Sequence, residues 1–211
     1  MIRTIIDKTA EQLTTAWRHN TVIDWYNENS APNEMNILAR FANAAAETWK
    51  EATAFYEVMI DNGRIDLLII SPEGILLVEG KTTFHSNTTY LIKSLNSQVE
   101  RVHGTNGGMR RLIDSKIPAY CRERWNLETP PPMYVVTLSW CNSRGLKAWE
   151  SSDKWSESIS GFTSGHTPFI FSEYEHYLLF KYKKTSGIAW LENDTLSAND
   201  SLQFIAETSL T

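Results

Sequence analysis

Two short apolar segments joined by a four-residue turn are the strongest constraint on the fold of this chain. Residues 65–70 and 75–81 are each brief, rich in Ile, Leu and Val, and separated by Ser-Pro-Glu-Gly at 71–74. Short apolar runs bounded by turn residues are typical of strands. Pro and Gly suit the second and fourth positions of a type I turn, so a β-hairpin is predicted, with Ile70 paired to Ile75. Both faces of these strands are apolar, as in central strands covered on both sides.

Three charged residues lie together at the open end of this hairpin. In the expected register Asp66 lies opposite Glu79, and the two-residue period of a strand places Lys81 on the same face as Glu79. A bulge in the turn would shift this register by one residue. The alternative is a surface hairpin whose charged groups are solvated or form an ordinary ion pair.

The chemistry of these side chains indicates a metal site. Two carboxylates on a buried strand are costly, because like charges at close range raise each other's pKa and resist desolvation. A divalent cation removes that cost, and carboxylate oxygens are the ligands that Mg²⁺ prefers. Lys81, two residues beyond Glu79, can orient an attacking water or stabilise charge on phosphorus. The pattern therefore predicts metal-assisted phosphodiester hydrolysis.

The order of elements predicts an α/β fold in a single compact chain of 211 residues. Helices are expected over residues 8–25, 34–51, 90–103 and 109–121, and strands over residues 54–60, 65–70, 75–81 and 133–139. The order α-β-β-β-α-β predicts a sandwich with a central mixed β-sheet flanked by helices. We expect an N-terminal helical extension at 1–32, a core at 33–145, and a C-terminal extension with an acidic tail at 146–211, packed on the same domain.

The C-terminal third gives weaker signals. A Gly/Ser-rich loop is expected to run to Gly165, and apolar runs follow at residues 169–171 and 177–182. The two cysteines, Cys121 and Cys141, have no metal-binding spacing. With no apolar run long enough to cross a bilayer and no segment resembling a signal peptide, the sequence predicts a cytoplasmic protein that does not bind membranes.

The charge distribution allows nucleic acid as a partner although the formal net charge is −5. Between residues 93 and 124, seven Lys and Arg oppose three acids, a local balance of +4. A local basic surface can neutralise a few phosphates whatever the global charge. The alternative is that these cations lie on ordinary solvated helix faces. The predicted contacts to the nucleic-acid backbone are Lys93, Arg101, Arg110 and Arg111.

The helix, the aspartate on the second strand and the Glu-Gly-Lys on the third resemble the PD-(D/E)XK nuclease superfamily, which includes restriction endonucleases, Holliday-junction resolvases and nuclease-related-domain proteins. The resemblance covers roughly residues 33–139, although Ile rather than Pro precedes the aspartate. It implies a restriction-endonuclease-like fold. It also implies that Asp66, Glu79 and the backbone carbonyl of Gly80 bind Mg²⁺, for which Mn²⁺ can substitute, and that Lys81 assists the attacking water.

Two further residues enter through the same resemblance. A glutamate in the first helix often completes such a site, and Glu34 holds that place, with Glu47 and Glu51 as rivals. The resemblance implies that Glu34 supports the metal or a second ion. Residues 96–99, Asn-Ser-Gln-Val, are similar to the Asn-Pro-x-x-Gln segment of the nuclease-related domain, without its proline. This similarity implies that Gln98 orients groups near the site.

The expected function is therefore a Mg²⁺-dependent DNA endonuclease, with DNA preferred over RNA as substrate, of a restriction, phage-defence, mobile-element or repair type. Cleavage of both strands would favour a homodimer. One alternative is a catalytically inactive nuclease-fold module that binds nucleic acid or a protein partner. Another is that the resemblance is accidental and the chain belongs to some other α/β class.

Overall fold

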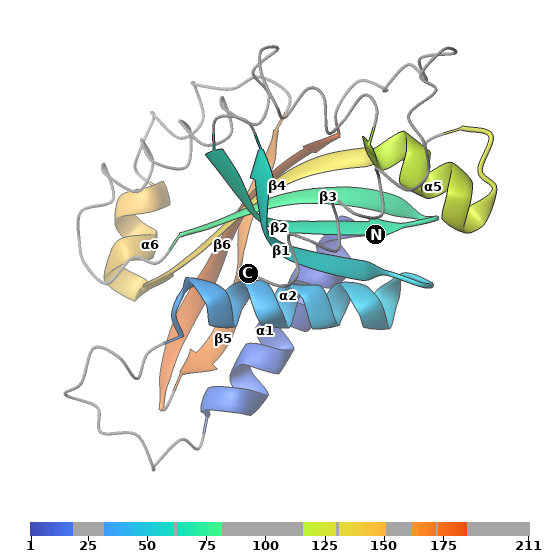
Figure 1. The fold of residues 1–211 in the computed structure, drawn as a ribbon. Coiled ribbons are helices and arrows are strands. Elements are labelled where there is room, and N and C mark those ends of the chain that lie inside the picture. Colours follow the sequence, from blue (N-terminus) through green and yellow to red (C-terminus); the bar gives the residue numbers. More distant parts are fainter. Residues whose placement is uncertain are drawn as a thin grey trace.

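The computed structural model describes residues 1–18, 32–60, 63–81, 116–129, 131–150, 162–171 and 173–184. These residues form a six-stranded mixed sheet in the order β1-β2-β3-β4-β6-β5, with helices on both faces (Figure 1). Only β3 and β4 are parallel neighbours; the other pairs are antiparallel. The strands are β1 (Thr53–Ile60), β2 (Gly63–Ser71), β3 (Gly74–Lys81), β4 (Met133–Asn142), β5 (Thr163–Phe171) and β6 (Tyr174–Lys184), and the helices are α1 (Ile2–Trp17), α2 (Glu34–Thr48), α5 (Ile117–Trp125) and α6 (Ser143–Glu150). The predicted α/β class with a mixed sheet and helices is confirmed.

The β2–β3 hairpin has the predicted register. Ser71 pairs with Gly74 and Ile70 with Ile75, so only two residues lie between the strands and no bulge shifts the pairing. Glycine is needed at position 74 because a Cβ there would lie 2.7 Å from the Trp49 side chain. The turn therefore packs against Trp49, the residue that follows α2.

Helix α2 begins at Glu34, as predicted, because Asn33 caps it. The Asn33 side chain accepts a hydrogen bond from the Asn36 backbone N–H at 2.8 Å, and the Asn36 side chain accepts one from the Asn33 N–H at 3.1 Å. This reciprocal capping box satisfies two donors that the first turn leaves without helical partners. The helix ends at Thr48, three residues before the predicted end, where Trp49 turns into an extended conformation. Its buried face includes the predicted Ile37, Leu38, Phe41 and Ala45.

The sheet separates two apolar clusters. The larger one joins α1 and α2 to one face of the sheet and includes Leu67, Val78 and Val136. The smaller one joins α5 to the other face and includes Leu77 and Val135. Successive residues of β3 and β4 thus point to opposite clusters, which explains why both faces of these strands are apolar.

Three expectations for the flanking elements were wrong. Helix α1 begins at Ile2 rather than near residue 8, because Ile2, Ile5 and Ile6 already belong to its buried face. The described part of the basic segment forms α5, which ends at Trp125 rather than near residue 121. The last residues of the loop expected to run to Gly165 belong to β5, which begins at Thr163.

The helix expected at residues 90–103 lies outside the described residues. Within the described part of the chain, no helix combines the length and apolar character needed to span a membrane.

Candidate active site

Asp66 lies where β2 and β3 separate. The paired register of these strands ends at Leu67–Val78, one position before Asp66 and Glu79. Beyond this point the strands are joined by a side chain instead: Asp66 Oδ2 accepts a hydrogen bond from the Gly80 backbone N–H at 2.9 Å. The carboxyl group is therefore held against the carboxyl end of β3, and only 9% of Asp66 is exposed.

The backbone next to Asp66 is irregular. The pairing of β1 with β2 passes from Tyr56–Leu67 to Val58–Ile65 and omits Glu57 and Asp66. Glu57 has a φ of 54°, a left-handed conformation that is uncommon for a residue with a side chain. As a result Val58 and Ile65 lie in the cluster on the α5 side, out of phase with the rest of their strands. Irregular strands of this kind are often found beside functional sites, where they redirect a side chain.

Glu79 is fully buried in the middle of the sheet. It shares a face of β3 with Leu77, on the α5 side, and its register partner on β4 is Thr137. The next residue on this face, Lys81, pairs in register with Ser139. The apolar face of the sheet therefore gives way to polar side chains at the carboxyl end of β3 and β4.

Glu34 joins this region from α2. Its Oε2 lies 3.3 Å from Lys81 Nζ, and both side chains are a little more than a quarter exposed. Gly80 allows this approach, because a Cβ at that position would lie 2.8 Å from Glu34 Cγ and 3.2 Å from Leu38 Cγ. The structure thus brings together Glu34, Asp66 and Lys81, which come from three different elements.

The electrostatics couple these groups. Burial is the main cause that raises the pKa of Glu34 above its ordinary value; the Lys81 ammonium lowers this pKa, and the Asp66 carboxylate raises it. Arg64 lowers it slightly. A carboxyl group that is both desolvated and close to a second carboxylate resists ionisation, and a bound cation would relieve that cost.

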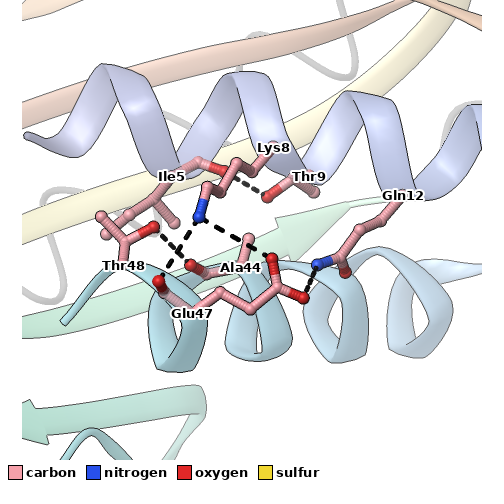
Figure 2. Close-up of polar contacts among 7 residues, drawn as sticks. All are labelled: Ile5, Lys8, Thr9, Gln12, Ala44, Glu47 and Thr48. Atoms are coloured by element: carbon pink, nitrogen blue, oxygen red, sulfur yellow. Dashed lines mark hydrogen bonds and ion pairs between the residues drawn. The ribbon is translucent and has the colours of Figure 1, made fainter. Parts of the chain in front are cut away.

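The two rival glutamates of this helical region have other roles. Figure 2 shows Glu47 at the end of α2, where it connects to α1: its Oε2 lies 3.8 Å from Lys8 Nζ and its Oε1 accepts a hydrogen bond from Gln12 at 3.0 Å. Glu51 accepts a hydrogen bond from the Trp125 indole N–H at 2.9 Å. Of the three candidates, Glu34 is the one that lies beside Lys81.

The donor set fits a magnesium ion in its chemistry. Glu34, Asp66 and Glu79 offer only carboxylate oxygens, which are hard ligands. Among the described residues, however, no group of three or more His, Cys, Asp or Glu is arranged so that it could hold a metal ion. A cation held here would therefore take few ligands from the described side chains and the remainder from water and phosphate, as Mg²⁺ commonly does.

Several predicted residues cannot be placed. Gln98 and all four predicted backbone contacts, Lys93, Arg101, Arg110 and Arg111, lie outside the described residues. Thr137 and Ser139, which follow the apolar start of β4 at a spacing of two, were not predicted from the sequence. The alternation of these two polar residues with apolar ones was the sequence signal that could have identified them.

Comparisons with protein-family models, with curated proteins and with solved structures found no match to this chain.

Proposed function

We propose that the protein is a metal-dependent nuclease that hydrolyses phosphodiester bonds, with DNA as substrate and internal bonds as targets. The observation that carries the proposal is the convergence of Glu34, Asp66 and Lys81 at the end of β3, beside the buried Glu79. Charged groups on central strands are expensive unless they are used or compensated. Carboxylates and an amine gathered at one strand end suit the chemistry of phosphoryl transfer.

The topology supports the same proposal. A capped helix is followed by three antiparallel strands and then by a strand parallel to the third, and the candidate residues lie at the carboxyl end of that third strand. This order is the one expected for a restriction-endonuclease-like sandwich, which we propose as the finer class of the fold. A homodimer would suit cleavage of both strands of a duplex, since it would place two sites about a two-fold axis.

Each residue has a role that follows from its position. Asp66 and Glu79, with the Gly80 carbonyl, would hold Mg²⁺, or Mn²⁺ in its place, and the hydrogen bond from the Gly80 N–H fixes the orientation of Asp66. When bound, the metal would polarise the phosphoryl oxygen and lower the pKa of a water molecule. Lys81 would orient the attacking water or stabilise negative charge on the phosphate. Glu34 positions the Lys81 ammonium through their 3.3 Å contact.

The proposal is tested by incubating supercoiled plasmid, linear duplex, branched DNA and single strands with the protein and Mg²⁺ or Mn²⁺. We expect metal-dependent cleavage that falls by about 100-fold or more in Asp66→Asn and Lys81→Met, as is typical when a group that stabilises the transition state is removed. Glu47→Gln is the matched control, because this carboxylate lies on the same helix but contacts α1. Its cleavage rate should equal that of the wild type.

A wild-type protein that cleaves none of these substrates with either metal would refute the proposal. Binding of nucleic acid without cleavage would instead support the alternative of an inactive nuclease-fold module. A Mg²⁺-dependent rise in the melting temperature that disappears in Asp66→Asn would separate loss of metal binding from loss of the later chemical step.

A further inference from the structure

Strands β1 and β2 change the face to which their side chains point at the position of Asp66. On β2, Leu67 packs in the cluster with α1 and α2, and regular alternation would place Ile65 there as well. Ile65 instead belongs to the cluster with α5. On β1, Tyr56 packs against the α1 and α2 cluster, whereas Val58 belongs to the α5 cluster. The alternation of both strands is therefore reversed beyond this position.

The reversal brings Arg64 to the α2 side of the sheet. Arg64 is next to Ile65, which is buried on the α5 side, so the Arg64 side chain points to the opposite face. Unbroken alternation would have placed Arg64 with Leu68 and Ile70 on the α5 side. The electrostatics agree, because the Arg64 charge lowers the pKa of Glu34, a residue of α2. Arg64 is thus close enough to the candidate site to act on the charge of its carboxylate.

Arg64 is accessible at this position, in contrast to the buried Asp66 and Glu79. Half of its side chain, 50%, is exposed to solvent. Its Nη1 lies 2.9 Å from Oε2 of Glu57, whose side chain is also 48% exposed. Exposed ion pairs of this kind contribute little to stability, so an anionic ligand can share or replace the contact. Glu57 therefore restricts the orientation of the guanidinium but leaves it open to solvent.

A guanidinium placed here has the chemistry that recognises phosphate. Its planar fork of N–H donors matches two oxygens of a phosphate group and keeps its positive charge at any physiological pH. Arg64 lies two residues from Asp66 along β2, a backbone separation of about 7 Å at roughly 3.4 Å per residue. A nucleic-acid strand with one phosphodiester at the candidate site can therefore bring a phosphate to Arg64.

We propose that Arg64, oriented by Glu57, binds a backbone phosphate of the nucleic acid beside the candidate site, on the α2 side of the sheet. This inference rests on the proposed nuclease function and adds a substrate-binding residue to it. The contact is to the backbone, so it positions the strand without reading its sequence. It also gives the left-handed conformation of Glu57 a function, since the reversal at that point is what places Arg64 on this face.

The test measures binding separately from cleavage. Dissociation constants of a short fluorescein-labelled duplex and of a single strand of the same sequence are measured in EDTA, at several salt concentrations. The variants are Arg64→Gln, Arg64→Lys, Glu57→Gln and the double variant Arg64→Gln/Glu57→Gln. Arg3→Gln is the matched control, because Arg3 forms an ion pair with Asp7 at the same 2.9 Å and with similar exposure, but on α1. Melting temperatures establish that each variant is folded.

We expect Arg64→Gln to weaken binding about tenfold, the value of one charge-assisted hydrogen bond. The slope of log affinity against log salt should fall by about 1, whereas Arg64→Lys and Arg3→Gln should leave it unchanged. Unaltered binding by Arg64→Gln would overturn the inference. An equal loss in Arg3→Gln would also overturn it, since the effect would then be one of overall charge.

The double variant separates a phosphate contact from simple neutralisation of Glu57. If Arg64 binds phosphate, Arg64→Gln should weaken binding by a similar factor in the Glu57→Gln background, where no carboxylate remains at that position. If Arg64 only neutralises Glu57, the loss should vanish in that background, and the inference fails. In cleavage assays Arg64→Gln should raise KM about tenfold and leave kcat unchanged, as expected for a contact made equally to the bound substrate and the transition state.

Failure of this inference is distinguishable from failure of the nuclease proposal. If the wild type cleaves DNA and Arg64→Gln binds and cleaves equally well, the phosphate contact is wrong and the nuclease proposal stands. If binding depends on Arg64 in both backgrounds but no cleavage occurs with any metal, the contact stands and the catalytic proposal fails. A wild type that binds neither probe overturns the contact.

Discussion

Gly80 decides how closely the first turn of α2 approaches the end of β3. A Cβ at this position would lie 2.8 Å from Glu34 Cγ and 3.2 Å from Leu38 Cγ, both near the base of helical side chains. We therefore expect Gly80→Ala to reduce the free energy of unfolding by about 1–3 kcal/mol, the usual cost of overpacking, and to displace Glu34 from Lys81. Urea unfolding gives the first quantity, and cleavage rate reports the second.

The double variant Gly80→Ala/Glu34→Ala supplies the control for that prediction. Removing Glu34 Cγ relieves the closer of the two contacts, so part of the lost stability should return and the two effects should be non-additive. Additive effects would show that the steric conflict does not involve Glu34.

The raised pKa of Glu34 predicts a pH dependence of stability. Burial raises this pKa above the ordinary value of 4.5, so the folded state retains the proton to higher pH than the unfolded state. The contribution of Glu34 to the free energy of unfolding is therefore present at low pH. It is lost as pH rises from about 4.5 through the folded-state pKa. The Glu34→Gln variant has no ionisable group at this position. The free energy of unfolding of Glu34→Gln minus that of the wild type should rise over this window and then become constant.

Urea unfolding at closely spaced pH values measures this difference. Glu47→Gln is again the control, because that carboxylate contacts α1 rather than Lys81, and its difference from the wild type should not follow the same curve. A difference for Glu34→Gln that falls as pH rises would mean that the attraction of Lys81 exceeds the effect of burial.

At the scale of the element, the start of α2 is fixed by its capping box. Asn33→Ala removes the side chain that accepts from the Asn36 N–H, and we expect a loss of about 1 kcal/mol of stability. Because Glu34 is the next residue, fraying of this turn should also lower cleavage more than the loss of stability alone explains. Asn33→Asp, which keeps an accepting oxygen, should retain both properties, and thermal unfolding with cleavage rates measures them.

The elements that the sequence predicted well are those specified by local interactions. The turn at Pro72 defines the β2–β3 register, and Asn33 defines the start of α2. Local patterns were therefore enough to group Asp66 with Lys81, whereas Glu34 was assigned to the same site only through the family resemblance. Strand β5 was missed because its pattern depends on distant packing. Glycine is needed at position 165 of this strand because a Cβ would lie 2.7 Å from the Phe180 ring of β6.

The same distinction explains why the pairing of β4 with β6 was not predicted. Thr137 and Lys181 are separated by 44 residues and meet only because β4 pairs with β6. No local pattern connects them, whereas Glu79 and Lys81 are adjacent on one strand face. The candidate pair Glu79 and Lys81 could therefore be inferred from a short motif, whereas the pairing of Thr137 with Lys181 required the assembled sheet.

Across the structure, α1 contacts both α2 and the edge strand β5. It packs against α2 through Glu47, and it reaches the edge strand β5, where Asp7 accepts a hydrogen bond from Thr167 at 3.0 Å and Thr14 accepts one from the Ile170 N–H at 2.9 Å (Figure 1). The α2 side carries Glu34, and the β5 edge carries Thr167 and Ile170. Helix α1 therefore couples the stability of both regions.

Leu13, which is fully buried in α1, tests this coupling. We expect Leu13→Ala to cost about 2–5 kcal/mol, the range for a large-to-small change in a core. If the sheet and its two apolar clusters unfold as one unit, tryptophan fluorescence and far-UV circular dichroism should shift to the same lower midpoint in urea. Thr15 is exposed in the same helix, so Thr15→Ala is the control. It should change the free energy of unfolding reported by either probe by no more than about 0.5 kcal/mol. Separate midpoints for the two probes would show that the sheet and its two apolar clusters do not unfold as one unit.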